Sequence, residues 1–200
     1  KMRGIETRRR DWCPLVGETM TKVLEMILKE GKIEESRIYA LEVINSVKRL
    51  HDVNSNWNLA EKLILSKQLS RGIDQYSVEM PHVEVCRKME KRGETSYGLG
   101  DRVPYMILPG ALKGNVSKFV DTPEYIREHG GAIDTSWYIE KQLLPPIQRI
   151  FNILNIDIFT GKQIPNQSNI FNFKLNENIK QCTNQSVTLP ALKTGIFAFK

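Results

Sequence analysis

The chain has 200 residues, and 40% of them are hydrophobic, a proportion that is ordinary for one globular domain. No apolar run approaches the roughly 20 residues that cross a bilayer, and the start lacks a secretory signal pattern, so we expect no membrane partner. Three widely spaced cysteines predict reduced thiols in an intracellular protein rather than a disulfide framework or a metal site. The net charge of +6 suits a nucleic-acid partner without proving one.

The first residues predict a strand that ends where a helix starts, with Asp11 as the N-cap of that helix. The basic side chains of this strand are Lys1, Arg3, Arg8, Arg9 and Arg10. Because an unpaired buried cation costs several kcal/mol of desolvation, the strand either stays wet or faces a polyanion such as DNA. The alternative is an ordinary solvated charge run.

Helical spacing dominates the body of the chain. Apolar residues recur at helical intervals from Trp12 to Leu28 and again from Ile38 to His51. Residues 54–58 predict a polar turn. Residues 59–69 alternate well enough to form a strand or a short helix.

The second half of the body predicts further helices around a small strand insert. A helix starts at Pro81 and ends at Gly93, and an apolar strand at residues 103–108 can pair with residues 115–120. The last helix runs from residue 134 past residue 151, with a kink expected at two adjacent prolines. We therefore predict a mainly α fold with a small β insert, of the α+β class.

The composition changes after residue 159. Residues 161–200 contain six Asn, four Gln and five Lys but one acidic residue, so we expect most of this tail to be disordered. One peptide in it resembles the motif Q-x-x-[ILM]-x-x-[FY]-[FY], by which replication proteins dock on sliding clamps, although Lys174 replaces the final aromatic residue. The predicted partner-binding residues are Gln167, Ile170, Phe171 and Phe173. The alternative is that this peptide and its echo at residues 193–200 dock on the protein's own body.

Five motifs follow one another in the order in which family-B DNA polymerases carry them. Residues 1–14 match K-x-x-G-[IV]-E-T-x-R-R-D-x-C-P, and residues 67–76 resemble K-x-L-[TS]-R-x-x-x-x-Y. Residues 81–93 resemble the family's P-H-V helix, residues 100–105 match G-[DE]-R-V-P-Y, and residues 134–151 resemble its last helix. The chain thus resembles the end of the palm and the thumb of delta-like and archaeal-like members.

This resemblance implies a palm end at residues 1–11, a thumb domain at 12–159 and a flexible tail at 160–200, which can lead into a cysteine-rich module in eukaryotic members. It also implies that the chain holds primer–template DNA through phosphates and sugars. The residues implied near the primer 3′ end are Lys1, Arg3, Arg9 and Arg10. Those implied in the thumb are Lys67, Arg71, His82, Lys88, Arg102 and Tyr105.

Several of these residues have plainer interpretations. Arg71 can pair with Asp74, His82 can serve a helix start, and Arg102 can bond Asp101. Glu6 and Asp11 are expected to orient the neighbouring arginines rather than to contact DNA.

The resemblance implies that the catalytic residues of the family lie outside this chain. Nucleotide transfer there uses metal ions, Mg²⁺ in the complete polymerase, held by aspartates of the motifs D-x-x-S-L-Y-P and Y-x-D-T-D. Neither motif occurs here, and Asp134-Thr135 lacks the second context, so Asp134 is predicted to be a helix N-cap. We expect no catalytic or metal-binding residue in this chain, and a partner that supplies the catalytic half.

The chain begins with Lys rather than Met, which favours a truncated polymerase or the smaller half of a split enzyme. Such an enzyme would work in the cytoplasm or nucleoid, or in the nucleus of a eukaryote. Two other classes remain open: a non-catalytic DNA-binding factor that kept the thumb, and an adaptor whose tail binds a sliding clamp.

Overall fold

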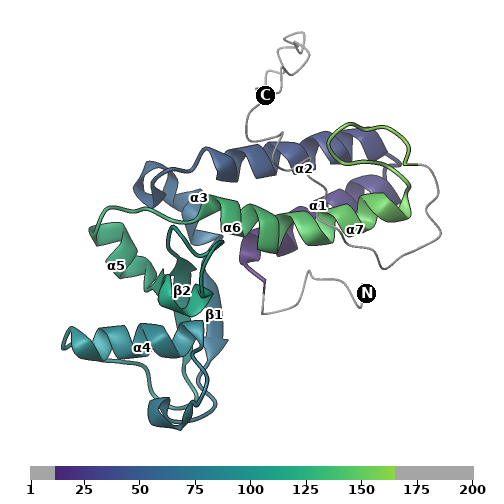
Figure 1. Ribbon diagram of the computed structural model, residues 1–200. Coiled ribbons are helices and arrows are strands. Elements are labelled where there is room, and N and C mark those ends of the chain that lie inside the picture. Colours follow the sequence, from purple (N-terminus) through teal and green to yellow (C-terminus); the bar gives the residue numbers. More distant parts are fainter. Residues whose placement is uncertain (1–11, 165–200) are drawn as a thin grey trace, which may run out of the picture. The chain divides into compact units, whose positions relative to one another are not determined.

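The computed structural model describes residues 12–164, which belong to one compact unit of residues 1–165; a second unit takes in residues 166–200, outside the described part. Helices make up most of the described residues, and three short antiparallel strands accompany them (Figure 1). The predicted mainly helical class with a small sheet is confirmed. Within the described residues, no helix is both long and apolar enough to cross a membrane.

Helices α1 (Pro14–Leu28) and α2 (Ile33–Lys48) pack against each other. The middle of the apolar stripe predicted for the first helix is buried, with Val16, Met20 and Val23 at most 1% exposed, whereas Leu28 at its end is 72% exposed. Each such buried side chain contributes about 1.5–3 kcal/mol relative to an exposed position. This stripe forms much of the contact between α1 and the rest of the unit.

The first helix starts differently from the prediction. Its N-cap is Cys13 rather than Asp11, and no side chain makes a capping hydrogen bond there. Pro14 sets the start instead, because its ring fixes a helical φ and lacks an N–H that would otherwise be unpaired.

The second helix begins at Ile33, ahead of the predicted Ile38, and ends before His51. Glu34 and Glu35 occupy its first turn, where negative charge is favourable. These two carboxylates interrupt the apolar spacing, which is why the periodicity alone misses the true start.

The polar segment 54–58 is more helical than the predicted turn. A 3-10 helix at Val53–Asn56 leads into α3 (Trp57–Glu61). The Asn56 side chain caps α3 by accepting a hydrogen bond from Leu59 N–H at 3.2 Å. Strand β1 (Leu65–Gln68) follows, so the segment predicted as strand or helix contains both.

The sheet has the order β1-β2-β3 and is antiparallel throughout. Strand β2 (Arg102–Ile107) confirms the predicted central strand. Its second partner is β3 (Val120–Asp121), because residues Val116–Lys118 of the predicted partner form a 3-10 turn instead. Of the predicted partner segment, residues 115–120, only Val120 belongs to the strand that pairs with β2.

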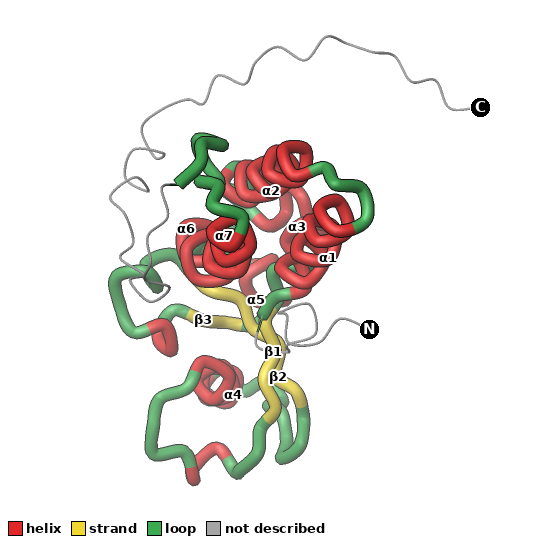
Figure 2. Tube along the Cα trace, turned by 90° about the vertical axis from the view of Figure 1, so that its right-hand side faces the viewer, coloured by secondary structure: helices red, strands yellow, loops and turns green. Residues whose placement is uncertain are grey.

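Helix α4 (Pro81–Lys91) confirms the predicted helix and packs on all three strands. Figure 2 shows β1 and β2 as a ribbon that runs from the helical part of the unit, near the start of α1, toward α4 and its loops. Helix α5 (Pro123–Glu128) follows β3 directly and contacts β2.

The last helical segment is interrupted where two prolines were expected to disturb it. Helix α6 (Thr135–Trp137), a π-helical turn at Tyr138–Leu143 and α7 (Leu144–Ile153) follow one another. Pro145 and Pro146 supply no N–H donor and crowd the turn before them. The helix is interrupted by the π-helical turn, which is wider than an α-helical turn.

Asp134 caps this segment, which confirms the predicted N-cap. Its Oδ1 accepts a hydrogen bond from Trp137 N–H at 2.9 Å. Its Oδ2 accepts from the N–H groups of Gly110 and Leu112 at 3.2 and 3.3 Å. One carboxylate thus joins the loop after β2 to the start of the last helical segment.

The chain turns back after α7. Ile156 and Gln163 form an antiparallel bridge, and Arg37 of α2 donates a hydrogen bond to Ile158 O at 2.8 Å. These contacts carry the folded part past residue 159, where the tail was expected to begin. The rest of that tail lies outside the described residues.

Candidate nucleic-acid interface

The π-helical turn contacts both strand β2 and Cys13, the residue just before α1. Tyr138 is fully buried, and its hydroxyl accepts a hydrogen bond from Ile107 N–H of β2 at 3.0 Å. Burial raises the pKa of Tyr138, so this hydroxyl stays neutral. Gln142 accepts a hydrogen bond from Cys13 N–H at 3.1 Å, just before the start of α1. Nothing in the helical pattern marks these two roles, so sequence reasoning missed them.

Three expected DNA contacts lie at one end of the β1–β2 ribbon. They are Lys67, Arg71 and Arg102, and they are called the ribbon cations below. All three side chains are exposed. Arg102 belongs to the last pair of the ladder, opposite Gln68, and Arg71 follows in the turn after β1. The fold therefore brings Arg102 to the same end of the ribbon as Lys67 and Arg71, which precede it by about 30 residues in the sequence.

Lys67 and Arg102 lie on opposite faces of this ribbon. Side chains alternate along a strand, and the register pairs Lys67 with Val103 and Gln68 with Arg102. The face of Lys67 is the one toward His82, since burial and then the Lys67 charge lower the pKa of His82 to about 4. The end of the ribbon thus carries positive charge on both faces.

Arg102 is held in place by the neighbouring strand. Its guanidinium donates to Ser66 O at 2.8 Å and to Ser66 Oγ at 3.0 Å. It does not bond Asp101, whose carboxylate accepts a hydrogen bond from Gly98 N–H at 2.9 Å. A guanidinium has five donors, so Arg102 can contact a phosphate from this fixed position.

Arg71 and Lys67 make no ion pair with any residue of the described range 12–164. The plainer interpretation, in which Arg71 pairs with Asp74, is therefore not what the structure shows. By contrast, Lys29, Lys32 and Lys62 lie within 4.0 Å of carboxylates, at 2.8, 3.1 and 2.6 Å. Other cations away from the ribbon also make no ion pair within the described part of the chain, among them Lys22, Lys113 and Lys141.

His82 is buried, in contrast to the ribbon cations. It is 1% exposed in the first turn of α4, and its ring meets that of Tyr76 edge-on, with centroids 5.7 Å apart. Its Nδ1 has no hydrogen-bond partner within residues 12–164. In this conformation His82 presents no surface to a phosphate. Tyr105, another expected contact, is half-buried in β2.

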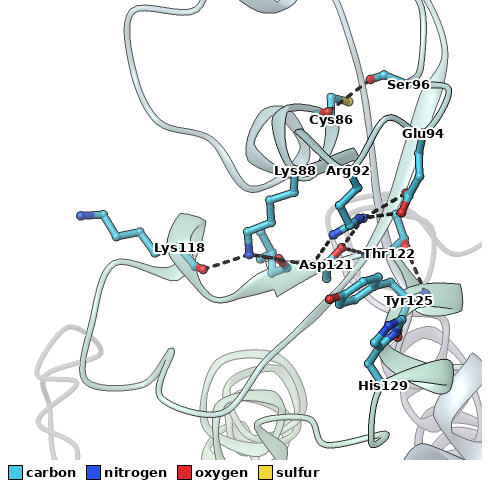
Figure 3. A network of polar contacts seen from close by, with 11 residues as sticks. Cys86, Lys88, Arg92, Glu94, Ser96, Lys118, Asp121, Thr122, Tyr125 and His129 are labelled. Carbon is cyan, nitrogen blue, oxygen red and sulfur yellow. Dashed lines mark hydrogen bonds and ion pairs between the residues drawn. The ribbon is translucent and has the colours of Figure 1, made fainter. Parts of the chain in front are cut away.

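Lys88 is half-buried, and its amine contacts other groups of the protein (Figure 3). Its Nζ donates to Val120 O at 2.7 Å and to Lys118 O at 3.3 Å, and it lies 4.0 Å from Asp121 Oδ2. These contacts tie α4 to the strand β3 rather than leaving the amine for a ligand.

Arg92, just after α4, forms the centre of the same network (Figure 3). It bonds Glu94 and donates to both Asp121 oxygens, at 3.0 and 3.1 Å, and these contacts raise its pKa. Its guanidinium also lies 4.0 Å from the centre of the Tyr125 ring. The network fastens α4 to β3 and α5, and so supports one face of the ribbon.

The remaining expected contacts lie outside the described residues and stay predictions. Those at the start of the chain are Lys1, Arg3, Arg9 and Arg10. Those in the tail are Gln167, Ile170, Phe171 and Phe173.

Within residues 12–164, no three His, Cys, Asp or Glu side chains gather in a way that could hold a metal ion. The two most buried aspartates already have partners, since Asp134 accepts backbone N–H groups and Asp121 accepts the guanidinium of Arg92. This part of the chain does not fit a Mg²⁺ site, and no chemical step is assigned to it.

A family model described as DNA polymerase family B matches residues 1–154. The match covers well over half of the chain, and the chain belongs to this family. Its motifs lie on the elements described above, from the ribbon and α4 to the last helical segment.

Individual relatives refine this assignment. The DNA polymerase delta catalytic subunits of Mesocricetus auratus and Schizosaccharomyces pombe are 37% and 35% identical to it, each over 74% of this chain and 13% of their own length. A DNA polymerase of Pyrococcus horikoshii is 34% identical over 74% of this chain and 11% of its own. The family B DNA polymerase structure from Pyrobaculum calidifontis superposes with a TM-score of 0.59 at 30% identity, covering 74% of this chain and 18% of that one. The chain thus spans a small part of the proteins that it resembles.

Proposed function

We propose that this chain is the part of a DNA-directed DNA polymerase that holds the primer–template duplex during DNA replication. Residues 1–11 are the end of the palm and residues 12–159 are the thumb. The metal-binding aspartates and their Mg²⁺ belong to another part of the enzyme or to a partner chain. The observation that carries this proposal is the set of ribbon cations, exposed and without ion pairs to residues 12–164, in a chain of a DNA polymerase family.

A polymerase must move along any sequence, so its grip belongs on phosphates and sugars rather than on base edges. Arg71 and Arg102 can each bind a phosphate through two parallel hydrogen bonds, and Lys67 can act as a mobile point charge. Because the ribbon end is positive on both faces, it can reach phosphates of both strands of a duplex. Ser66 holds Arg102 before DNA arrives, which lowers the entropy lost on binding.

The ribbon cations can be tested with a charge-matched control. The variant Lys67→Ala, Arg71→Ala, Arg102→Ala is compared with Lys29→Ala, Lys32→Ala, Lys62→Ala in the full 200-residue chain. Each variant removes three positive charges, but the second set already has carboxylate partners. We expect the first variant to weaken primer–template binding roughly 10- to 100-fold and the second to have a much smaller effect. Equal losses in the two variants would refute a specific role for the ribbon.

Arg10 gives a second test, in the complete polymerase. A primer 3′ hydroxyl displaced by about 1 Å can react ~100-fold more slowly, so its grip matters to rate as well as to affinity. We expect Arg10→Ala to weaken primer–template binding, to reduce processivity and to shift the balance toward exonuclease action or dissociation. Unchanged processivity at physiological salt would remove Arg10 from the site.

The polymerase role itself calls for a partner experiment. The full chain is mixed with a candidate catalytic half, and templated primer extension is measured. Extension that requires both chains supports the proposal. Duplex binding without extension, with every candidate half, would favour a non-catalytic DNA-binding factor.

A further inference from the structure

A tyrosine hydroxyl closes the turn that carries Arg71. Tyr76 Oη accepts a hydrogen bond from Ser70 N–H at 3.0 Å and lies 3.2 Å from Ser70 Oγ. Hydrogen bonding with the side chain and then the backbone of Ser70 lowers the pKa of the Tyr76 hydroxyl. A 3-10 turn at Ile73–Gln75 completes the loop between the two residues.

Both ends of this loop are anchored to buried residues. Leu69 is 1% exposed, donates to Asp101 O at 2.9 Å and accepts from Gly100 N–H at 2.8 Å. At the other end, the ring of Tyr76 lies at 89° to the ring of the buried His82. Between these anchors, Ser70 and Arg71 stay exposed.

The hydrogen-bond pattern leaves one donor available. Tyr76 Oη already accepts the N–H of Ser70, so its own proton can go to Ser70 Oγ. The Ser70 hydroxyl then keeps its proton for another acceptor. A hydroxyl donor beside an unpaired guanidinium is a combination that suits a phosphate oxygen.

We propose that Tyr76 is a positioning residue for a phosphate contact made by Ser70 and Arg71. The inference rests on the proposed function, because the phosphate belongs to the bound duplex. Tyr76 does not touch the DNA; it holds the Ser70–Arg71 peptide against an anchored loop before DNA arrives. Less conformational freedom is then lost when the phosphate binds.

A double-mutant cycle tests this inference in the full chain with a primer–template duplex. Tyr76→Phe removes the hydroxyl and keeps the ring on His82. We expect it to weaken binding roughly 2- to 10-fold when Arg71 is present, and to have almost no further effect in the Arg71→Ala background. It should also make the dependence of affinity on salt shallower, as Arg71→Ala does by about one unit of slope.

Tyr39→Phe, on α2, is the matched control and should leave binding unchanged. A purely structural role for Tyr76 would lower the melting temperature and weaken binding equally in both Arg71 backgrounds, and that result would overturn the inference. So would unchanged binding by Tyr76→Phe. If Arg71→Ala weakens binding but the effects of the two substitutions are additive, the proposed function is supported and the positioning role of Tyr76 is refuted. If Arg71→Ala has no effect, the phosphate contact at Arg71 falls as well.

Discussion

The buried imidazole of His82 should make the stability of this protein depend on pH. Burial, helped by the charge of Lys67, lowers the pKa of His82 from 6.5 to about 4. The unfolded chain therefore binds this proton more readily than the folded chain does, so stability falls as the pH drops from about 6.5 toward 4. We expect a loss of about 2 kcal/mol in the free energy of unfolding between pH 7 and pH 5.

Urea unfolding at the two pH values measures this loss. His82→Leu should remove most of the pH dependence, whereas the exposed His51→Asn should keep it. A wild-type chain with the same free energy of unfolding at pH 7 and pH 5 would contradict a neutral buried imidazole.

Single residues differ in how far the sequence predicts them. The N-cap role of Asp134 was predicted correctly because it depends on the residues next to it in the chain. The burial of His82 could not be predicted, since its surroundings come from Tyr76 and Lys67, on other segments. The same holds for Arg102, whose partner Ser66 lies on the neighbouring strand.

At the scale of elements, α4 is fastened to β3 through Asp121, which pairs with Arg92 and lies 4.0 Å from Lys88. Asp121 is 4% exposed and receives two hydrogen bonds from Arg92, whereas Glu94 on the same guanidinium is exposed. Removing Asp121 takes away the buried partner of the guanidinium and leaves only the exposed Glu94 beside it. We expect Asp121→Ala to cost about 3 kcal/mol of stability and Glu94→Ala less than about 1 kcal/mol.

Chemical denaturation of the two variants provides the comparison. Equal and small losses would mean that packing alone, without the Arg92 ion pair, holds α4 against the sheet.

The elements themselves were predictable where apolar spacing is regular, as in α1 and α4. The prediction failed where charge interrupts that spacing, as at the start of α2, where Glu34 and Glu35 precede the stripe. It also failed where a segment is stabilised from outside. The π-helical turn at Tyr138–Leu143 depends on the prolines after it and on contacts to β2 and Cys13, and no local pattern marks it.

At the scale of the described unit, the ribbon and the start of α1 depend on the same helical turn. Tyr138 bonds β2, and Gln142 bonds the residue just before α1. In our proposal these are the two places where the chain grips the duplex, at the ribbon end and at residues 1–11. Because one turn contacts both β2 and Cys13, we expect it to hold the ribbon and the start of α1 at a fixed separation.

The family was accessible from the sequence because its motifs are local and collinear, and the match over residues 1–154 confirms that resemblance. The sequence motifs do not predict which cations lack ion pairs in the described part of the chain. Lys62 meets Glu18 from another helix, and Lys88 meets backbone carbonyls near β3, so their charges are engaged only once the chain is folded. The folded structure is therefore what separates Arg71 from Lys88 as candidates for DNA contact.

The salt dependence of primer–template binding by the full 200-residue chain is the most direct test of a phosphate grip. If about five phosphates are neutralised, the logarithm of the affinity should fall with the logarithm of salt concentration at a slope near −4 to −5, for duplexes of any sequence. A slope near zero, or an affinity set by base sequence rather than by salt, would contradict the account.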